Sequence, residues 1–241
     1  MSIRTLFIGW LLLHVWAPLR AQDDCRQELL RLAKDMQARV NVAGKGHLRA
    51  ELEIHSQAAG QAPEVVLHTT VSVAPGRSIV ENEHFSSYID PQDRVVVLHT
   101  EKQVMIHPQV GTAKAPTDWE QFNEALILTS TVATCRTNGK EGSDLVIELQ
   151  APADKGPIAS VRYVVDTRKD LITDMETTYR PGHMLHRYRI RFLSYRPGEV
   201  DPRLAGPAVD HVLAGGRLRP ALADHRLRDH RISEKPQAKK P

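Results

Sequence analysis

The sequence lacks a large excess of charge of either sign. Its 241 residues carry a formal net charge of +3. Removal of residues 1–21, which contain Arg4 and Arg20 and no acidic residue, would lower the net charge to +1 (3 − 2). A patch of Lys and Arg is the usual electrostatic mark of a nucleic-acid-binding protein. The composition therefore gives no electrostatic reason to expect nucleic acid as a partner.

The sequence also lacks the short motifs of common enzyme classes. It contains no Gly-x-Ser-x-Gly, no Cys–His pair beside an activating group, no glycine-rich phosphate loop and no dinucleotide fingerprint. The carboxylate pairs Glu51/Glu53 and Glu81/Glu83 each lie on one side of a predicted strand, on the side expected to face solvent. We therefore predict no catalytic residue and no cofactor, and we retain an enzyme only as a minor alternative.

The twelve histidines raise the question of a metal site. His183 and His186 are the closest pair, at the spacing of one helical face. They fall at the start of a predicted strand, however, where residues i and i+3 point to opposite sides. His225 and His230 lie among arginines that would repel a cation. We predict no metal site.

Only the N-terminus carries a long apolar run. Arg4 precedes the largely apolar residues 6–16, and Leu19-Arg20-Ala21 fits a cleavage site before Gln22. A membrane-spanning helix needs about 20 apolar residues, which is longer than this run. The pattern predicts a signal peptide over residues 1–21 and a periplasmic or otherwise secreted protein without a transmembrane segment, with a membrane anchor as the alternative.

The two cysteines are Cys25 and Cys135. Cys25 follows Gln22-Asp23-Asp24, which is unlike the small and apolar residues that precede a lipidated cysteine. Two cysteines in an exported chain most often pair, so we predict a disulfide between them, with two separate buried thiols as the alternative. By chain entropy, a crosslink that closes so long a loop contributes at most about 4 to 5 kcal/mol of stability.

Periodicity in the first third of the chain predicts one helix followed by strands. Residues 24–40 place apolar side chains, Leu29 and Met36 among them, at helical spacing. From residue 47 the period changes to two, which predicts strands over residues 47–55 and 65–73 with one apolar and one wet side. The residues expected on the apolar side are Leu48, Leu52, Val65, Leu67 and Val71.

The rest of the chain continues this antiparallel pattern with one interruption. Short turns divide residues 79–107 into a meander, because connections of a few residues join antiparallel neighbours. A capping box at Thr117 and Glu120 opens a predicted helix over residues 117–133, whose apolar face begins with Trp119 and Phe122. Four more strands are predicted over residues 145–149, 159–165, 171–179 and 184–195.

The last long strand has two contrasting sides. Tyr188, Ile190 and Phe192 alternate with Arg187, Arg189 and Arg191. We expect the three arginines to form a solvated outer face, with an acidic partner as the alternative. Residues 197–220 are rich in proline and glycine, which indicates a loop. We predict an edge strand over residues 225–232 and a disordered basic tail over residues 233–241.

The order of these elements resembles a known family. The stretch Ser87-Tyr88-Ile89-Asp90-Pro91 before Arg94-Val95-Val96-Val97 is similar to the strand–turn–strand centre of the periplasmic carriers of outer-membrane lipoproteins and their receptor, the LolA/LolB-like superfamily. The resemblance covers about residues 24–195. It implies a mainly β fold, an unclosed antiparallel β-barrel or half-barrel, with an N-terminal helix and an inserted helix covering the concave face. We expect one such domain over residues 22–232, with residues 197–232 as an extension.

Together these features predict an exported bacterial envelope protein that binds a lipid, an acyl chain or another apolar ligand in a cavity between sheet and helices. Lipoprotein or lipid trafficking is the setting that the resemblance implies. Two alternatives stay open: the same residues fill a solid core, or the chain is a non-enzymatic envelope module that docks a protein partner. The residues predicted to line the cavity are Leu29, Met36, Leu52, Leu67, Val71, Trp119, Phe122, Tyr188, Ile190 and Phe192.

Overall fold

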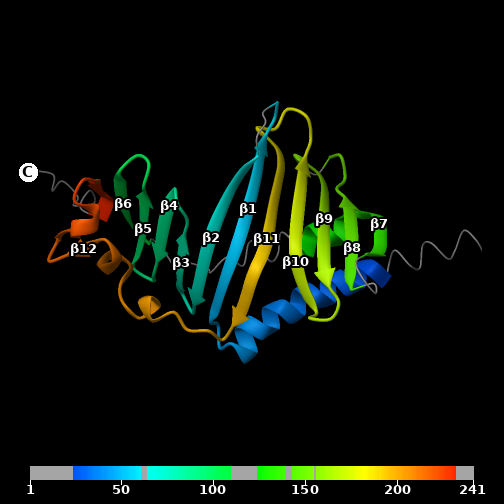
Figure 1. Ribbon diagram of the computed structural model, residues 1–241, viewed down its shortest axis with the longest axis horizontal. Coiled ribbons are helices and arrows are strands. Elements are labelled where there is room, and N and C mark those ends of the chain that lie inside the picture. Colours follow the sequence, from blue (N-terminus) through cyan, green and yellow to red (C-terminus); the bar gives the residue numbers. More distant parts are fainter. Residues whose placement is uncertain (1–23, 61–63, 110–123, 139–142, 155, 232–241) are drawn as a thin grey trace, which may run out of the picture. The chain divides into compact units, whose positions relative to one another are not determined.

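The computed structural model describes residues 24–60, 64–109, 124–138, 143–154 and 156–231 of the chain. The fold is mainly β, as predicted (Figure 1). The predicted signal peptide, the basic tail, and the cavity residues Trp119 and Phe122 lie outside the described residues. Within the described ranges, no helix is long and apolar enough to cross a membrane.

Twelve strands follow one another in a single hydrogen-bonded order, β14-β6-β5-β4-β3-β2-β1-β11-β10-β9-β8-β7. The two ends of this order are different strands, so the sheet of the described residues is not closed, as predicted. The first six strands are β1 (Leu48–Ala58), β2 (Val65–Ala74), β3 (Arg77–Glu81), β4 (Phe85–Ile89), β5 (Asp93–Leu98) and β6 (Gln103–Pro108). The others are β7 (Thr131–Asn138), β8 (Asp144–Gln150), β9 (Ile158–Asp166), β10 (Leu171–Tyr179), β11 (Leu185–Pro197) and β14 (Arg226–Asp229).

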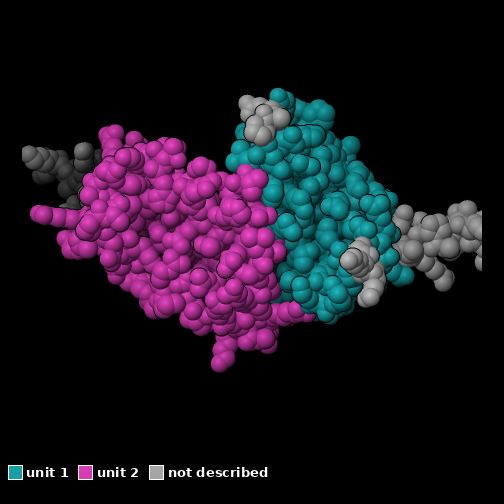
Figure 2. All heavy atoms as spheres, viewed as in Figure 1, with its two compact units in different colours: residues 1–37, 55–65, 118–191 teal, residues 38–54, 66–117, 192–241 magenta. Residues whose placement is uncertain are grey.

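The chain divides into two compact units, coloured separately in Figure 2. Unit 1 lies within residues 1–37, 55–65 and 118–191, and unit 2 lies within residues 38–54, 66–117 and 192–241. Strands β1, β2 and β11 contribute residues to both units. The single domain over residues 22–232 stays a prediction, and each unit is described by itself below.

Unit 1 is a helix-covered sheet. A helix over residues 24–38, blue in Figure 1, and a short helix over residues 124–129 contribute Leu29 and Ile127 to one buried cluster. The strands contribute Ile147, Tyr163 and Met175, which the antiparallel register of β8, β9 and β10 places side by side. The apolar stripe of the N-terminal helix therefore packs on the face of the sheet formed by β8, β9 and β10. Its C-terminal end continues as the π-helical turn η1 (Arg39–Ala43).

The disulfide predicted from the two cysteines is present. Cys25, in the first helix, is bonded to Cys135 of β7, with their Cα atoms 6.4 Å apart. The bond closes a loop of 110 residues. It therefore ties the covering helix to the edge of the sheet beneath it.

The predicted helix over residues 117–133 is wrong at its C-terminal end. The described part of the helix covers residues 124–129, and β7 begins at Thr131. The β-branched residues Thr131, Val132 and Thr134 favour a strand. The described residues between this helix and residue 198 consequently form five strands, where the sequence predicted four.

The prediction of a solvated arginine row on β11 is also wrong in part. Arg189 donates to both carboxylate oxygens of Asp174, with Nε–Oδ2 at 2.8 Å, and the Asp174 side chain is only 6% exposed. The same side of the sheet carries an ion pair between Arg187 and Glu64 at 3.1 Å. Of the three arginines, Arg191 alone is an exposed residue. This face of unit 1 is built from partly buried ion pairs, because a buried carboxylate needs a cationic partner.

Unit 2 has a covering layer that the sequence did not predict. The sequence predicts loop over most of residues 201–222, but they form a succession of short ordered elements packed on one face of the sheet. These elements are the 3₁₀ turns η3 (Pro202–Ala205), η4 (Ala208–His211) and η5 (Pro220–Leu222), and the hairpin of β12 (Leu213–Ala214) and β13 (Arg217–Leu218). The edge strand predicted over residues 225–232 is confirmed as β14, which pairs parallel to β6.

Candidate functional site

The structure distributes the predicted cavity residues between the two units. In unit 1, Leu29 is fully buried in the core cluster and Ile190 packs against that cluster. The Met36 sulfur accepts the backbone N–H of Ile172 at 3.3 Å. Tyr188 is half-buried and pairs with Thr177 of β10, on the same side of β11 as Ile190. Leu29 and Met36 therefore belong to the covering helix, and Ile190 packs against the cluster that the helix forms with the sheet.

The other predicted residues that the structure describes lie in unit 2, where Leu52, Leu67 and Val71 share one side of the sheet. His68 lies 3.9 Å from Glu53, so these two residues are on a common side. Side chains alternate along a strand, which puts Leu52 and Leu67 together on the opposite side. Val71 is four residues beyond Leu67 on β2 and follows the same parity. Phe192 of β11 is half-buried, with its ring edge-on to Tyr195 at 5.9 Å between centroids.

The side that carries Val71 is apolar across five strands. The antiparallel register aligns Val71 with Val80, Val80 with Ser87, Ser87 with Val96, and Val96 with Met105. Adjacent rows add further apolar residues on the same side. We call this side the open face; its apolar residues on β2 to β6 within unit 2 are Leu67, Val71, Val73, Val80, Phe85, Ile89, Val96, Leu98 and Met105, and each of them is half-buried.

The opposite side of the same strands is closed by residues 201–222, and we call it the sealed face. Val95 and Val97 of β5 are 0% and 1% exposed, and they pack with Ala208 and Val212 of the covering segment. Val96, between them in sequence, points to the open face and remains half-exposed. The covering segment of residues 201–222 therefore packs on the sealed face.

An apolar row facing outward is unusual for an antiparallel sheet. Such sheets commonly present polar residues on their solvated side. Here the outward residues of β5 and its neighbours are Val96, Leu98 and Met105. Contiguous exposed apolar surface on a soluble protein marks a binding site for a ligand, a membrane or a partner. The open face is therefore the candidate site.

Charge is sparse on the open face. Three rows cross it, through Ser87, through Ile89 and through Leu98, and none of them contains Asp or Glu. The row through Ile89 continues to Arg94 and ends in His107, whose ring stacks on His230 at 4.5 Å between centroids. The face offers a ligand apolar contact over most of its area and positive charge at one end.

A hydrogen-bond network fixes the covering segment on the sealed face. Asp201 accepts from Ser72 at 2.8 Å and from Arg203 at 2.8 Å, and Arg203 also donates to Glu81 at 2.8 Å. The guanidinium of Arg203 lowers the pKa of Asp201 and outweighs the opposing effect of burial. Because Asp201 also caps η3, one buried carboxylate joins the start of the segment to the sheet.

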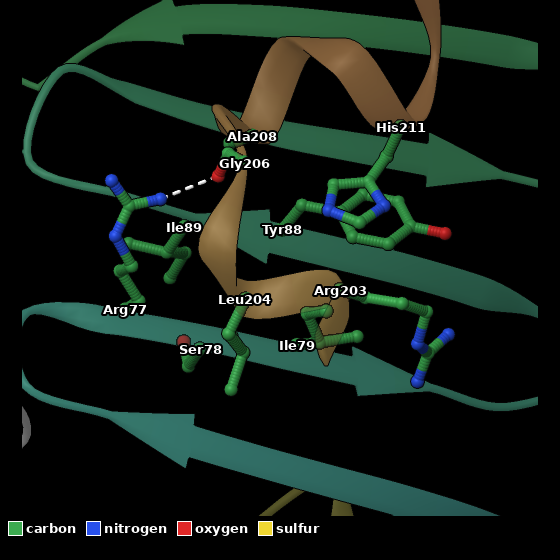
Figure 3. A pocket seen from close by; sticks show the side chains of 10 residues that line it. All are labelled: Arg77, Ser78, Ile79, Tyr88, Ile89, Arg203, Leu204, Gly206, Ala208 and His211. Atoms are coloured by element: carbon green, nitrogen blue, oxygen red, sulfur yellow. Dashed lines mark hydrogen bonds between the residues drawn. The ribbon is translucent and has the colours of Figure 1, made fainter. Parts of the chain in front are cut away.

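An aromatic contact between Tyr88 of β4 and His211 of η4 adds to this network (Figure 3). Their rings are stacked at 4.3 Å between centroids, and the Tyr88 hydroxyl donates to Glu81 at 3.0 Å. Arg77 donates to the carbonyl of Gly206, the bond drawn in Figure 3. The gap that these residues leave has room for about one water molecule, so the covering segment leaves no ligand-sized cavity there.

A second carboxylate holds the middle of the segment. Asp90 accepts the backbone N–H of Ala208 at 2.6 Å, and it also caps its own turn through Gln92 and Asp93. Burial acts to raise the pKa of Asp90, but the three backbone N–H groups together lower it.

Sequence reasoning identifies the Asp90 turn and misses the role of the network. Asp201-Pro202, a cap residue followed by proline at the first helical position, is the one local signal for η3. The prediction of a wet face for Glu81 is wrong, because its side chain holds both Tyr88 and Arg203. Among the described residues, no three or more His, Cys, Asp or Glu side chains are grouped as a metal site would require.

Comparison with known proteins gives structural similarity only. No family model matches the chain, and no curated protein sequence matches it. An uncharacterized conserved protein from Thermus thermophilus is similar over 82% of this chain and 98% of its own, at 10% identity and a TM-score of 0.43. A putative outer membrane lipoprotein-sorting protein domain from Vibrio parahaemolyticus is similar over 72% and 94%, at 12% identity and a TM-score of 0.34. A LolA superfamily protein from Nitrosomonas europaea is similar over 71% and 97%, at 12% identity and a TM-score of 0.29. TM-scores this low carry no argument about function.

Proposed function

We propose that this chain is an exported, non-catalytic protein that binds a lipid or another long acyl ligand on the open face of unit 2. The observation that carries the proposal is the contrast between the two sides of β5. Val95 and Val97 are sealed by the chain itself, while Val96 and its apolar neighbours are left half-exposed. Apolar side chains that are only partly buried, on the side of the sheet opposite to the covering segment, form a surface suited to an apolar ligand.

The disulfide supports the exported location within this proposal. Disulfides form and persist in oxidising compartments and are rare in the cytosol. Cys25 and Cys135 form such a bond, and it constrains a loop of 110 residues. Periplasmic export in a bacterium, with cleavage near Ala21, is the location that we propose.

The proposal is tested by titrating the delipidated protein with a fluorescent long-chain fatty acid. We expect saturable binding that Val71→Gln and Val96→Gln each weaken by about tenfold, a change of about 1.4 kcal/mol in binding free energy. His68→Gln is the matched control, because His68 lies on β2 near Val71 but on the opposite side and is largely exposed. Absence of saturable binding would end the proposal, as would equal losses from Val71→Gln and His68→Gln. Lipid-independent capture of a protein by the open face would favour the docking module instead.

A further inference from the structure

Two polar side chains at one end of the open face have buried atoms without a hydrogen-bond partner. Thr69 is 2% exposed, and its hydroxyl oxygen has no partner. The side-chain nitrogen of Asn82 is likewise buried and unpartnered. Buried polar groups are almost always hydrogen-bonded, so two such atoms in one place require an explanation.

The register places these two groups side by side on the open face. The paired register ends with Thr70 and Glu81 on the sealed side, and its continuation by one residue brings Thr69 and Asn82 opposite each other on the open side. Directly opposed residues of antiparallel strands have Cβ atoms about 5 Å apart. A single oxygen atom lying between the two side chains is therefore within hydrogen-bond reach of both.

The orientation of the Asn82 amide is fixed by its own turn. Its oxygen accepts the backbone N–H groups of His84 and Phe85, both at 2.9 Å. An oxygen is required there because both of these partners are donors. The nitrogen is therefore the free end, and it can only donate. The Thr69 hydroxyl can donate as well as accept, so the two groups together can donate to one acceptor oxygen.

We infer that this pair binds a neutral carbonyl oxygen of the ligand, as in an ester or an amide of a fatty acid. The inference rests on the proposed binding of an acyl ligand to the open face. Neither Lys nor Arg lies in the row that runs from Asn82 through Phe85 and Leu98 to Gln103, so a buried carboxylate would have no cation to offset its desolvation. The apolar chain then extends over Val71, Val80 and the residues beyond them, and the carbonyl accepts from Thr69 and Asn82.

Competition among three ligands of similar chain length tests this inference. Methyl decanoate, decanoate and undecane are each used to displace a bound fluorescent acyl probe from the delipidated protein. We expect the ester to compete about tenfold better than the alkane, the size of effect that two modest hydrogen bonds give, and better than the carboxylate.

Two variants locate the preference. Thr69→Val removes the hydroxyl at nearly constant volume, and Asn82→Asp keeps the oxygen that closes the turn while it replaces the donor nitrogen. Each is expected to reduce the preference for ester over alkane to about threefold or less. Gln103→Leu is the matched control, because Gln103 lies on the same face with a buried unpartnered nitrogen but about 14 Å away, three strand spacings from Asn82.

The outcomes separate this inference from the proposed function. If the probe binds to the open face but the wild-type protein does not prefer the ester, or if Thr69→Val leaves the preference intact, the inference is wrong and the proposed function stands. If Gln103→Leu removes the preference instead, the carbonyl site lies elsewhere and the inference is again wrong. If the probe does not bind at all, the proposed function fails first. The melting temperature of ligand-free Thr69→Val gives an independent readout: it should equal or exceed that of wild type, and a marked fall would show that the hydroxyl already has a partner.

Discussion

The two sides of β5 should respond differently to the same substitution. Val95 is fully buried between the sheet and the covering segment, whereas Val96 is half-exposed on the open face. Val95→Ala removes two carbons at about 0.8 kcal/mol each and leaves a void, so we expect it to cost about 2 to 3 kcal/mol of unfolding free energy. Val96→Ala removes the same atoms from a half-buried site, where less buried apolar surface is lost, and we expect it to cost about 1 kcal/mol or less. The difference in strand propensity between Val and Ala is the same in sign at both neighbouring positions, so the comparison largely isolates burial.

Urea denaturation of the two variants, followed by circular dichroism, measures this difference. Unchanged m-values would show that both variants unfold from the same compact state. Equal costs of about 2 kcal/mol or more would mean that the open face is packed as tightly as the sealed face. That result would contradict the contrast on which the binding site rests, whatever ligand assays show.

The disulfide, the Arg189 ion pair and the Asp201 carboxylate give three further tests. Reduction of the Cys25–Cys135 disulfide should lower the unfolding free energy by up to about 4 to 5 kcal/mol, and an unchanged melting temperature in reductant would contradict the tether. Arg189→Gln leaves the Asp174 carboxylate buried without its cation and should lower the unfolding free energy by about 2 to 3 kcal/mol, as measured by urea denaturation. A loss below about 0.5 kcal/mol would mean that Arg189 lies on a solvated surface, as the sequence predicted. The pKa of Asp201 is lowered in the folded protein, so the Asp201 carboxylate stabilises the fold. This contribution is complete above about pH 4, the ordinary pKa range of an unfolded Asp, and it is lost as the pH falls through the lowered pKa of the folded state. Asp201→Asn should therefore flatten the acid limb of a stability–pH curve below about pH 4, and an identical acid limb would refute this role.

Local patterns in the sequence predict the strands well. The alternation from Leu48 to Ile54, and again from Leu67 to Val73, is strict enough to give the strands and their two sides. The first helix, its apolar stripe and the disulfide partner of Cys25 are likewise predictable from spacing and compartment. The helix that contains Ile127 is predicted too long because Ala133 falls at helical spacing, while the β-branched residues around it favour a strand.

The site could not be predicted in the same way, because it depends on contacts distant in sequence. Alternation shows that Val95 and Val96 point to opposite sides, but both are valine, so their sequence gives no sign of which side is covered. The answer lies in residues 201–222, where Ala208 and Val212 seal the side of Val95. Proline and glycine make that segment look like loop, and its order comes from Asp201 and Asp90, whose partners are more than 100 residues away. The parallel pairing of β14 with β6 is equally invisible to local patterns.

The most direct test of the account is to locate a bound acyl chain on the protein. A spin-labelled stearic acid broadens the NMR signals of methyl groups close to it, and the methyl-bearing residues of unit 2 report on both sides of the sheet. We predict broadening of Val71, Val96 and Met105 on the open face, with Val95 and Val97 on the sealed face much less affected. Broadening confined to Leu29 and Ile190 would place the ligand beneath the helix of unit 1 and would contradict a binding site on the open face.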